Sequence, residues 1–268
     1  YILARWYKPT SPLNRYLEDL KSKERAKREE KILSLNEYYF GRTRWDKAII
    51  RLYNLNSKYF FCSEALRNNF INEERKWRYP QNKVITFVTT GTGSALKGFD
   101  LVLKTAKLLK SHAPFEFNWL LCGASIYDIK RFERKINIKS SDVSVIPLGI
   151  CSAEIVKEHL LNAFLYIHTA YIDNSPNAIC EAQYIGLPII STNVGGICSL
   201  FADDYPKEAF VPTNDPYLLA SVIIDIYKNK VRMMEMANSN YKISRERHND
   251  EKIYDSLLNA YIQILEEN

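Results

Sequence analysis

Long apolar runs are missing from this chain of 268 residues. No stretch approaches the roughly 20 apolar residues that a membrane-spanning helix needs, and the amino-terminal stretch lacks the basic-then-apolar pattern of a secretory signal. The sequence therefore predicts a protein that neither spans a membrane nor carries a visible export signal. We expect a cytoplasmic location.

Cysteines are few, and none forms a Cys-x-x-Cys arrangement. Their odd number, wide spacing and apolar surroundings indicate reduced thiols in the core rather than a disulfide framework. Reduced thiols also favour a cytosolic compartment. The five are Cys62, Cys122, Cys151, Cys180 and Cys198.

Several ligand-binding motifs are absent as well. There is no zinc-finger spacing and no RNA-recognition signature, so we expect no nucleic-acid partner. The Walker motif GxxxxGK[ST] is missing, and so is a convincing Asp-x-Asp metal motif, because Asp203 and Asp204 stand next to each other in a predicted loop.

The composition is that of an ordinary folded protein, with 46% hydrophobic and 25% charged residues. The net charge is +6, and much of the excess lies in residues 21–28, which read Lys-Ser-Lys-Glu-Arg-Ala-Lys-Arg. Two interpretations of this stretch are open. It is either a solvated helix face or a contact with anionic lipid head groups at the inner face of a membrane.

The first 80 residues are predicted to form a partial α/β lobe. The chain begins with Tyr1 rather than Met, and we expect it to be a piece of a longer protein. A charged connection at residues 72–83 suggests a boundary at residue 80. Within the lobe the residue pattern predicts strands over 37–41 and 58–62 and helices over 13–35 and 43–53, the second with Thr43 as its N-cap. A further helix is predicted to be capped by Ser63.

Residues 81–250 are predicted to form a Rossmann-like α/β domain, a parallel sheet with helices on both faces. Strands alternate with helices of about 10 to 15 residues, which requires crossover connections between parallel strands. The final segment, residues 251–268, is predicted to be a helix that packs across the seam between the lobes. The expected strands are 84–89, 116–121, 143–147, 164–168 and 188–191, and the expected helices are 99–112, 126–137, 152–162 and 177–186.

Loops that follow the strands are the places to look for function, because ligands bind at the carboxyl ends of parallel strands. One such loop is residues 89–98, Thr-Thr-Gly-Thr-Gly-Ser-Ala-Leu-Lys-Gly. Backbone amides near Gly93, the Ser94 hydroxyl and the Lys97 ammonium could together hold a diphosphate. An ordinary tight turn is the other interpretation.

A second loop runs from Asp173 to Glu181, Asp-Asn-Ser-Pro-Asn-Ala-Ile-Cys-Glu. Pro176 suits the first position of a helix, which leaves the amides of Asn177 and Ala178 free to face a phosphate. Asp173 and Glu181 lie at different heights along this helix, so both can accept hydrogen bonds from sugar hydroxyls in one pocket. Glu181 sits among apolar residues and therefore needs a partner for its charge.

Two further features can each be interpreted in two ways. The loop of residues 191–196 ends in paired glycines, which either line donor phosphates or simply close a turn. His168 ends a strand close to Asp173, where it either lines the pocket or has a structural role.

Residues 173–196 resemble the carboxyl-terminal donor domain of glycosyltransferase family 4, which is retaining and has the GT-B fold. The resemblance covers about residues 84–268, and the segment before it is similar to the last β-α units of the family's acceptor lobe. The matching motifs are Asp173-x7-Glu181-Ala182, Gly186-Leu-Pro188, Gly195-Gly196, Lys97-Gly-Phe-Asp100, and Gly149 after a later strand.

The resemblance implies a role for each candidate residue. Lys97 would neutralise the leaving diphosphate, and Asp173 would contact the transferred sugar; these two are the expected catalytic residues. Glu181 would hold the ribose hydroxyls. The remaining expected pocket residues are Gly93, Ser94, Gly149, His168, Ser175, Asn177 and Ala178. No metal and no other cofactor is expected.

Two positions depart from the family pattern. The family has Glu where this chain has Asp173, and its arginine before the lysine is replaced here by Gly91 or Thr92.

The resemblance implies an activity. We expect transfer of a sugar from a UDP- or GDP-sugar to a glycan or lipid-linked acceptor, in polysaccharide assembly. The alternatives are a nucleotide-sugar-binding module without activity in this form and a nucleotide-sugar epimerase.

Overall fold

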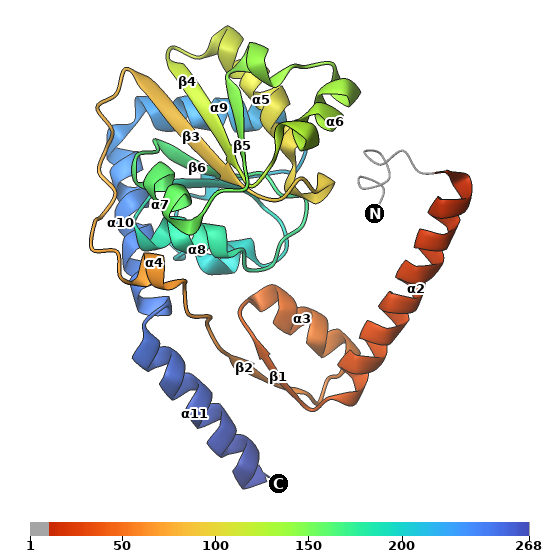
Figure 1. Ribbon diagram of the computed structural model, residues 1–268. Helices are drawn as coiled ribbons and strands as arrows, with labels where there is room; N and C mark the ends of the chain where they lie inside the picture. Colours follow the sequence, from red (N-terminus) through yellow and green to blue (C-terminus); the bar gives the residue numbers. More distant parts are fainter. Residues whose placement is uncertain (1–10, 268) are drawn as a thin grey trace. The chain divides into compact units, whose positions relative to one another are not determined.

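The computed structural model describes residues 11–267, which form two compact units (Figure 1). Described residues up to 65 and from 247 onward make the smaller unit, and residues 66–246 make the larger one. We expected the boundary at residue 80. The preceding segment belongs to the larger unit because Trp77 is buried there, with its backbone N–H 2.7 Å from the Ile185 carbonyl and its indole Nε1 2.7 Å from the Ala163 carbonyl.

A six-stranded parallel sheet forms the centre of the larger unit, in the order β5-β4-β3-β6-β7-β8. This confirms the predicted fold class. The strands are β3 (Val84–Thr90), β4 (Glu116–Cys122), β5 (Val145–Gly149), β6 (Leu165–His168), β7 (Ile189–Thr192) and β8 (Phe210–Val211).

The order of the strands creates a switch point between β3 and β6. The chain enters the sheet at β3, moves outward through β4 to β5, returns to β6 beside β3, and then moves outward in the other direction. In open parallel sheets the loops separate at such a point and leave a crevice at the carboxyl ends of the strands. Thr90 ends β3 and His168 ends β6.

Helices cover both faces of this sheet (Figure 1). On one side α5 packs against α6 and α9; on the other, α4 contacts α7 and α8, and α10 packs on α8. The helices are α4 (Asn68–Ile71), α5 (Phe99–His112), α6 (Ile126–Ile136), α7 (Ala153–Leu161), α8 (Asn177–Tyr184), α9 (Pro216–Lys228) and α10 (Lys230–Arg247), with short 3-10 helices η1 (Ala95–Lys97), η2 (Ser140–Val143), η3 (Ile197–Leu200) and η4 (Lys207–Ala209).

The core of the larger unit lies around the central strands. All residues of β6 and β7 are buried, as expected for strands covered on both faces. Two hydrogen bonds pair buried polar side chains there: Trp119 Nε1 donates to Thr89 Oγ1 at 2.9 Å, and Thr89 Oγ1 donates to the Ile167 carbonyl at 2.6 Å. Asn240 ties α10 to the core by donating from Nδ2 to the Leu187 carbonyl at 2.8 Å.

The smaller unit contains a two-stranded parallel sheet, β1 (Tyr38–Gly41) and β2 (Lys58–Phe61). Thr43 caps the helix between them as predicted, in a capping box with Asp46. The further helix expected from Ser63 is wrong: residues 62–67 are irregular, and the short α4 begins later. The other helices of this unit are α2 (Pro12–Leu35), α3 (Arg44–Tyr53) and α11 (Asp250–Glu267).

None of the five cysteines forms a disulfide, but they are not all in the core, since Cys62 and Cys151 are half-buried. Cys122 and Cys180 are buried as predicted, whereas Cys198 is exposed, because it lies on the short 3-10 helix η3 at the surface. Within residues 11–267 no helix is both long enough and apolar enough to cross a membrane.

Candidate functional site

Backbone hydrogen bonds join the loops that follow β3, β4 and β5. The Gly91 N–H donates to the Cys122 carbonyl at 2.9 Å, and the Gly123 N–H donates to the Gly149 carbonyl at 2.6 Å. Gly149 in turn donates to the Ala124 carbonyl at 2.9 Å. Gly123 has φ +97°, and a Cβ there would lie 2.7 Å from the Gly91 carbonyl oxygen. These contacts hold three loops together as one rim at the carboxyl ends of the strands.

The loop after β3 also contacts the loop after β6. Thr169 Oγ1 donates to the Lys97 carbonyl at 2.9 Å, and the Tyr171 N–H donates to the Leu96 carbonyl at 2.8 Å. Gly98, at φ +69°, leaves no room for a Cβ against the Thr169 carbonyl oxygen. The switch point therefore brings Lys97 to the residues that follow β6.

Lys97, Asp173 and His168 form a cluster at this point. Lys97 Nζ lies 2.7 Å from Asp173 Oδ2, and His168 Nε2 lies 3.2 Å from the same oxygen. The Asp173 backbone is held from the other side, because its carbonyl accepts from the Gly196 N–H at 3.3 Å and Gly195 packs against it. The paired glycines of residues 195–196 thus position Asp173.

Electrostatics fix the charges in this cluster. Burial alone would raise the pKa of Asp173, but His168 and Lys97 together lower it to about 2. Burial lowers the pKa of His168, which is 3% exposed, because it opposes the charged imidazolium, although Asp173 partly offsets this. Near neutral pH the cluster therefore holds an ionised Asp173 carboxylate and a neutral His168 imidazole.

Glu181 is buried on α8, with 2% of its surface exposed. Its two carboxylate oxygens accept from Arg67, at 2.7 Å from Nε and 2.7 Å from Nη2. Burial raises the pKa of Glu181, and Arg67 opposes this increase. The sequence indicated that Glu181 needs a partner, but it did not identify Arg67, because the irregular segment before α4 carries no motif.

A pocket of about 590 Å³ opens beside Glu181. It combines a carboxylate, the start of a helix and an apolar wall that includes Ile150, which is 97% exposed. Pro176 is the N-cap of α8 rather than its first helical residue. Its carbonyl accepts from the Ile179 N–H at 3.0 Å, whereas the amides of Asn177 and Ala178 precede the first hydrogen bond of the helix. The pocket is lined by Arg67, Thr90, Thr92, Cys122, Gly123, Ile150, Cys151, Val156, Asn177, Ala178 and Glu181.

The Asp173 cluster lies next to this pocket rather than in its lining. Tyr166 links the two: its hydroxyl lies 2.9 Å from Thr90 Oγ1, which lines the pocket, and 3.4 Å from His168 Nδ1. The structure therefore places the acidic pair in two adjoining sites. Glu181 belongs to the pocket, and Asp173 belongs to the cluster with Lys97.

The other predicted residues surround these sites without lining the pocket. Gly93 accepts from Arg131 Nη2 at 3.3 Å through its carbonyl, and the Ser94 hydroxyl accepts from the Leu96 N–H at 3.3 Å and caps η1. Gly149 takes part in the rim of loops described above. Ser175 lies in the bend between Asp173 and α8.

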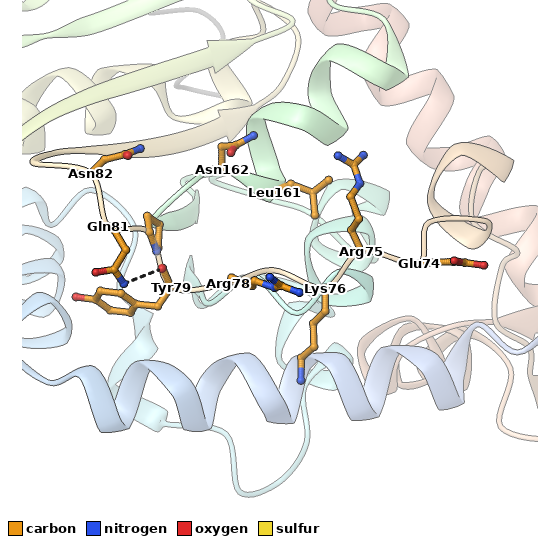
Figure 2. Close-up of a pocket in the computed structure, with 10 residues that line it drawn as sticks. Glu74, Arg75, Lys76, Arg78, Tyr79, Gln81, Asn82, Leu161 and Asn162 are labelled. Carbon is orange, nitrogen blue, oxygen red and sulfur yellow. Dashed lines mark hydrogen bonds between the residues drawn. The ribbon is translucent and has the colours of Figure 1, made fainter.

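A second pocket, of about 770 Å³, lies near the opposite ends of the strands from the first (Figure 2). Its lining residues 79–82 precede β3, and residues 161–162 come shortly before β6, so it sits at the amino ends of these strands. Figure 2 shows Arg75, Lys76 and Arg78 along it. Arg75 already pairs with Glu73 and Glu158. We do not assign this pocket to a nucleotide, because it faces away from the switch point.

A family model described as "Glycosyl transferases group 1" matches residues 70–246. The chain belongs to this family. A curated relative, the phosphatidylinositol N-acetylglucosaminyltransferase gpi3 subunit of Schizosaccharomyces pombe, is 24% identical over 166 residues, which are 60% of this chain and 36% of that protein.

Solved structures of GT-B glycosyltransferases share the fold. Staphylococcus aureus TarM, solved with UDP, fondaparinux and α-GlcNAc-glycerol, has a TM-score of 0.69 at 16% identity, over 88% of this chain and 46% of that one. Anabaena HepE, solved with UDP and glucose, has a TM-score of 0.66 at 14% identity, over 84% and 62%. The chain thus spans about half the length of these relatives.

Proposed function

We propose that this chain is the donor-binding part of a retaining glycosyltransferase that uses a UDP-sugar. The observation that carries the proposal is the pocket beside α8, where a buried carboxylate and the first residues of a helix, Asn177 and Ala178, lie together at the switch point of the sheet. Carboxylates accept from paired hydroxyls, and helix starts attract phosphates. A nucleoside diphosphate presents both groups.

The pocket suggests an orientation for the nucleotide. We assign the ribose hydroxyls to Glu181 and the phosphates to the amides of Asn177 and Ala178. The apolar side chains of Ile150 and Val156 offer a surface for the base. TarM and HepE, which share this fold, were each solved with UDP, and this favours UDP over GDP.

The adjoining cluster would act on the sugar and on the leaving group. Lys97 would neutralise the charge that develops on the departing diphosphate. Asp173, which lies beside Lys97, would accept a hydrogen bond from a hydroxyl of the transferred sugar. His168 would hold Asp173 in place while remaining neutral. Since Lys97 and the helix amides supply positive charge, the proposal requires no metal ion.

The acceptor is proposed to be a glycan or a lipid-linked molecule. The relative from Schizosaccharomyces pombe is by name a phosphatidylinositol N-acetylglucosaminyltransferase subunit. The basic stretch at residues 21–28 lies on α2 and is largely exposed, so it could contact anionic lipids at the cytoplasmic face. Co-sedimentation with vesicles that do or do not contain an anionic lipid tests this contact. The smaller unit is proposed to be the end of the acceptor lobe.

Calorimetric titration with UDP, GDP and ADP tests the donor site. We expect UDP to bind most tightly, and Glu181→Gln and Lys97→Ala each to weaken it by about tenfold, because each removes a charged hydrogen-bonding group. The exposed Glu116 and Lys107 allow matched controls, Glu116→Gln and Lys107→Ala, which should bind UDP as the parent does.

Two results of this titration would count against the donor site. One is a parent protein that binds none of the three nucleotides. The other is a pair of site variants that bind UDP as well as their controls do. If UDP binds but a longer form of the protein does not release it from a UDP-sugar and acceptor, the chain is a binding module rather than part of an enzyme.

A further inference from the structure

Arg67 has a place in the donor pocket that the family motifs do not account for. Among the described residues that line the pocket, it alone carries a cationic side chain. The arginine that the motif would place before Lys97 is replaced by Gly91 or Thr92, and Thr92 lines the same pocket. Arg67 therefore brings positive charge to the pocket from a different segment of the chain.

The geometry leaves part of the guanidinium available. Arg67 Nε and Nη2 bind the two oxygens of Glu181, whereas the structure describes no hydrogen bond from Nη1. The arginine side chain is 50% exposed and that of Glu181 only 3%. A guanidinium has five N–H donors, and the ion pair uses two of them. The rest can reach a ligand while the ion pair stays intact.

Arg67 also determines the charge balance of the pocket. Without Arg67, the charged group left in the lining would be the Glu181 carboxylate, which would repel a diphosphate. Lys97 cannot fully compensate, because it already pairs with Asp173 at 2.7 Å. The backbone of Arg67 is also fixed, since its carbonyl accepts from the N–H groups of Phe70 and Ile71 at 2.8 and 3.1 Å.

We propose that Arg67 binds the diphosphate of the nucleotide donor directly while it holds Glu181 in place for the ribose. This inference rests on the proposed donor site. It assigns to the segment before the sheet a second phosphate-binding cation beside Lys97, in place of the arginine that the loop after β3 lacks.

A double-mutant cycle with UDP tests the direct contact. The dissociation constant is measured by ligand-observed NMR, which reaches millimolar affinities, for the parent, Arg67→Met, Glu181→Gln and the double variant. We expect Arg67→Met to weaken UDP binding by about tenfold in both the parent and the Glu181→Gln background, since a charged hydrogen bond is lost in each. Arg134→Met, at an exposed arginine of α6, is the matched control and should have no effect.

The outcomes separate the roles of Arg67. If Arg67→Met weakens UDP only when Glu181 is present, Arg67 acts through that carboxylate and the direct contact is refuted. If it has no effect in either background, both roles are refuted. A parent protein that binds no UDP overturns the proposed function itself. The double variant leaves no buried unpaired carboxylate, so its circular dichroism spectrum shows whether a loss reflects binding rather than folding.

Discussion

The packing of Gly195 against Asp173 yields a prediction that can be worked out from geometry. Gly195 has φ +53°, and a Cβ at this position would overlap the Asp173 carbonyl oxygen. Gly149 has φ +72°, but a Cβ there would meet no atom within 4 Å. The two glycines therefore share a left-handed backbone and differ in the space around them, so Gly149→Ala is a matched control for Gly195→Ala.

The expected losses of stability follow from this difference. A left-handed backbone costs a residue with a Cβ about 1–2 kcal/mol, so Gly149→Ala should lower the free energy of unfolding by about that amount. Gly195→Ala carries the same cost and adds a steric overlap worth about 1–3 kcal/mol, for a total of about 2–5 kcal/mol. Urea unfolding of the full chain, followed by tryptophan fluorescence, measures both values.

A second measurement locates the damage. If the new methyl group displaces Asp173 from Lys97 and His168, the pKa of its carboxyl group, about 2 in the parent, should rise in Gly195→Ala and stay low in Gly149→Ala. Carbon-13 NMR of the carboxyl group reports this pKa. Equal losses of stability in the two variants, or an unchanged Asp173 pKa in Gly195→Ala, would refute the argument that Gly195 positions Asp173.

Two further predictions concern acid sensitivity and the core. Burial lowers the pKa of His168 and that of His248, the latter to about 4, so below about pH 6.5 the unfolded chain binds more protons than the folded one. The free energy of unfolding should therefore fall as the pH drops below that value. It should fall again between about pH 4 and 2, where the Asp173 carboxylate is protonated. Urea midpoints between pH 7.5 and 3 check this, and a flat profile from 7.5 to 4.5 would contradict it. Asn240→Ala should lower the free energy of unfolding by about 2–4 kcal/mol, because it leaves the buried Leu187 carbonyl without its donor at 2.8 Å and opens a cavity. A loss below about 1 kcal/mol in urea unfolding would show that the site repacks.

Much of the larger unit could be predicted because its signals are local. The strands that line the switch point are short apolar runs between turns, and the alternation of strands and helices implies parallel pairing. The N-cap at Thr43 could be predicted for the same reason, since it depends on a single residue at the start of a helix. The helix expected at Ser63 was wrong, because a capping residue alone does not form a helix. The segment around Trp77 read as a charged linker, although one buried indole attaches it to the larger unit.

The candidate site was predictable in part. Loops after parallel strands were the right place to look, and the spacing of Asp173 and Glu181 put both near the start of one helix. The partner of Glu181 could not be predicted, because Arg67 lies 114 residues away in sequence and only the folded chain brings the two together. The sequence also could not predict that Asp173 turns toward Lys97 while Glu181 turns into the pocket. Spacing along a helix does not determine which neighbours are present.

The bonds between the loops after β3, β4 and β5 bear on how such a pocket could evolve. The hydrogen bonds of Gly91, Gly123 and Gly149 lie within one unit of the chain, so these loops brace one another. A ligand that enters does not need to order these loops, so less conformational entropy is lost on binding. Side chains elsewhere along the pocket can then vary without disturbing these loops.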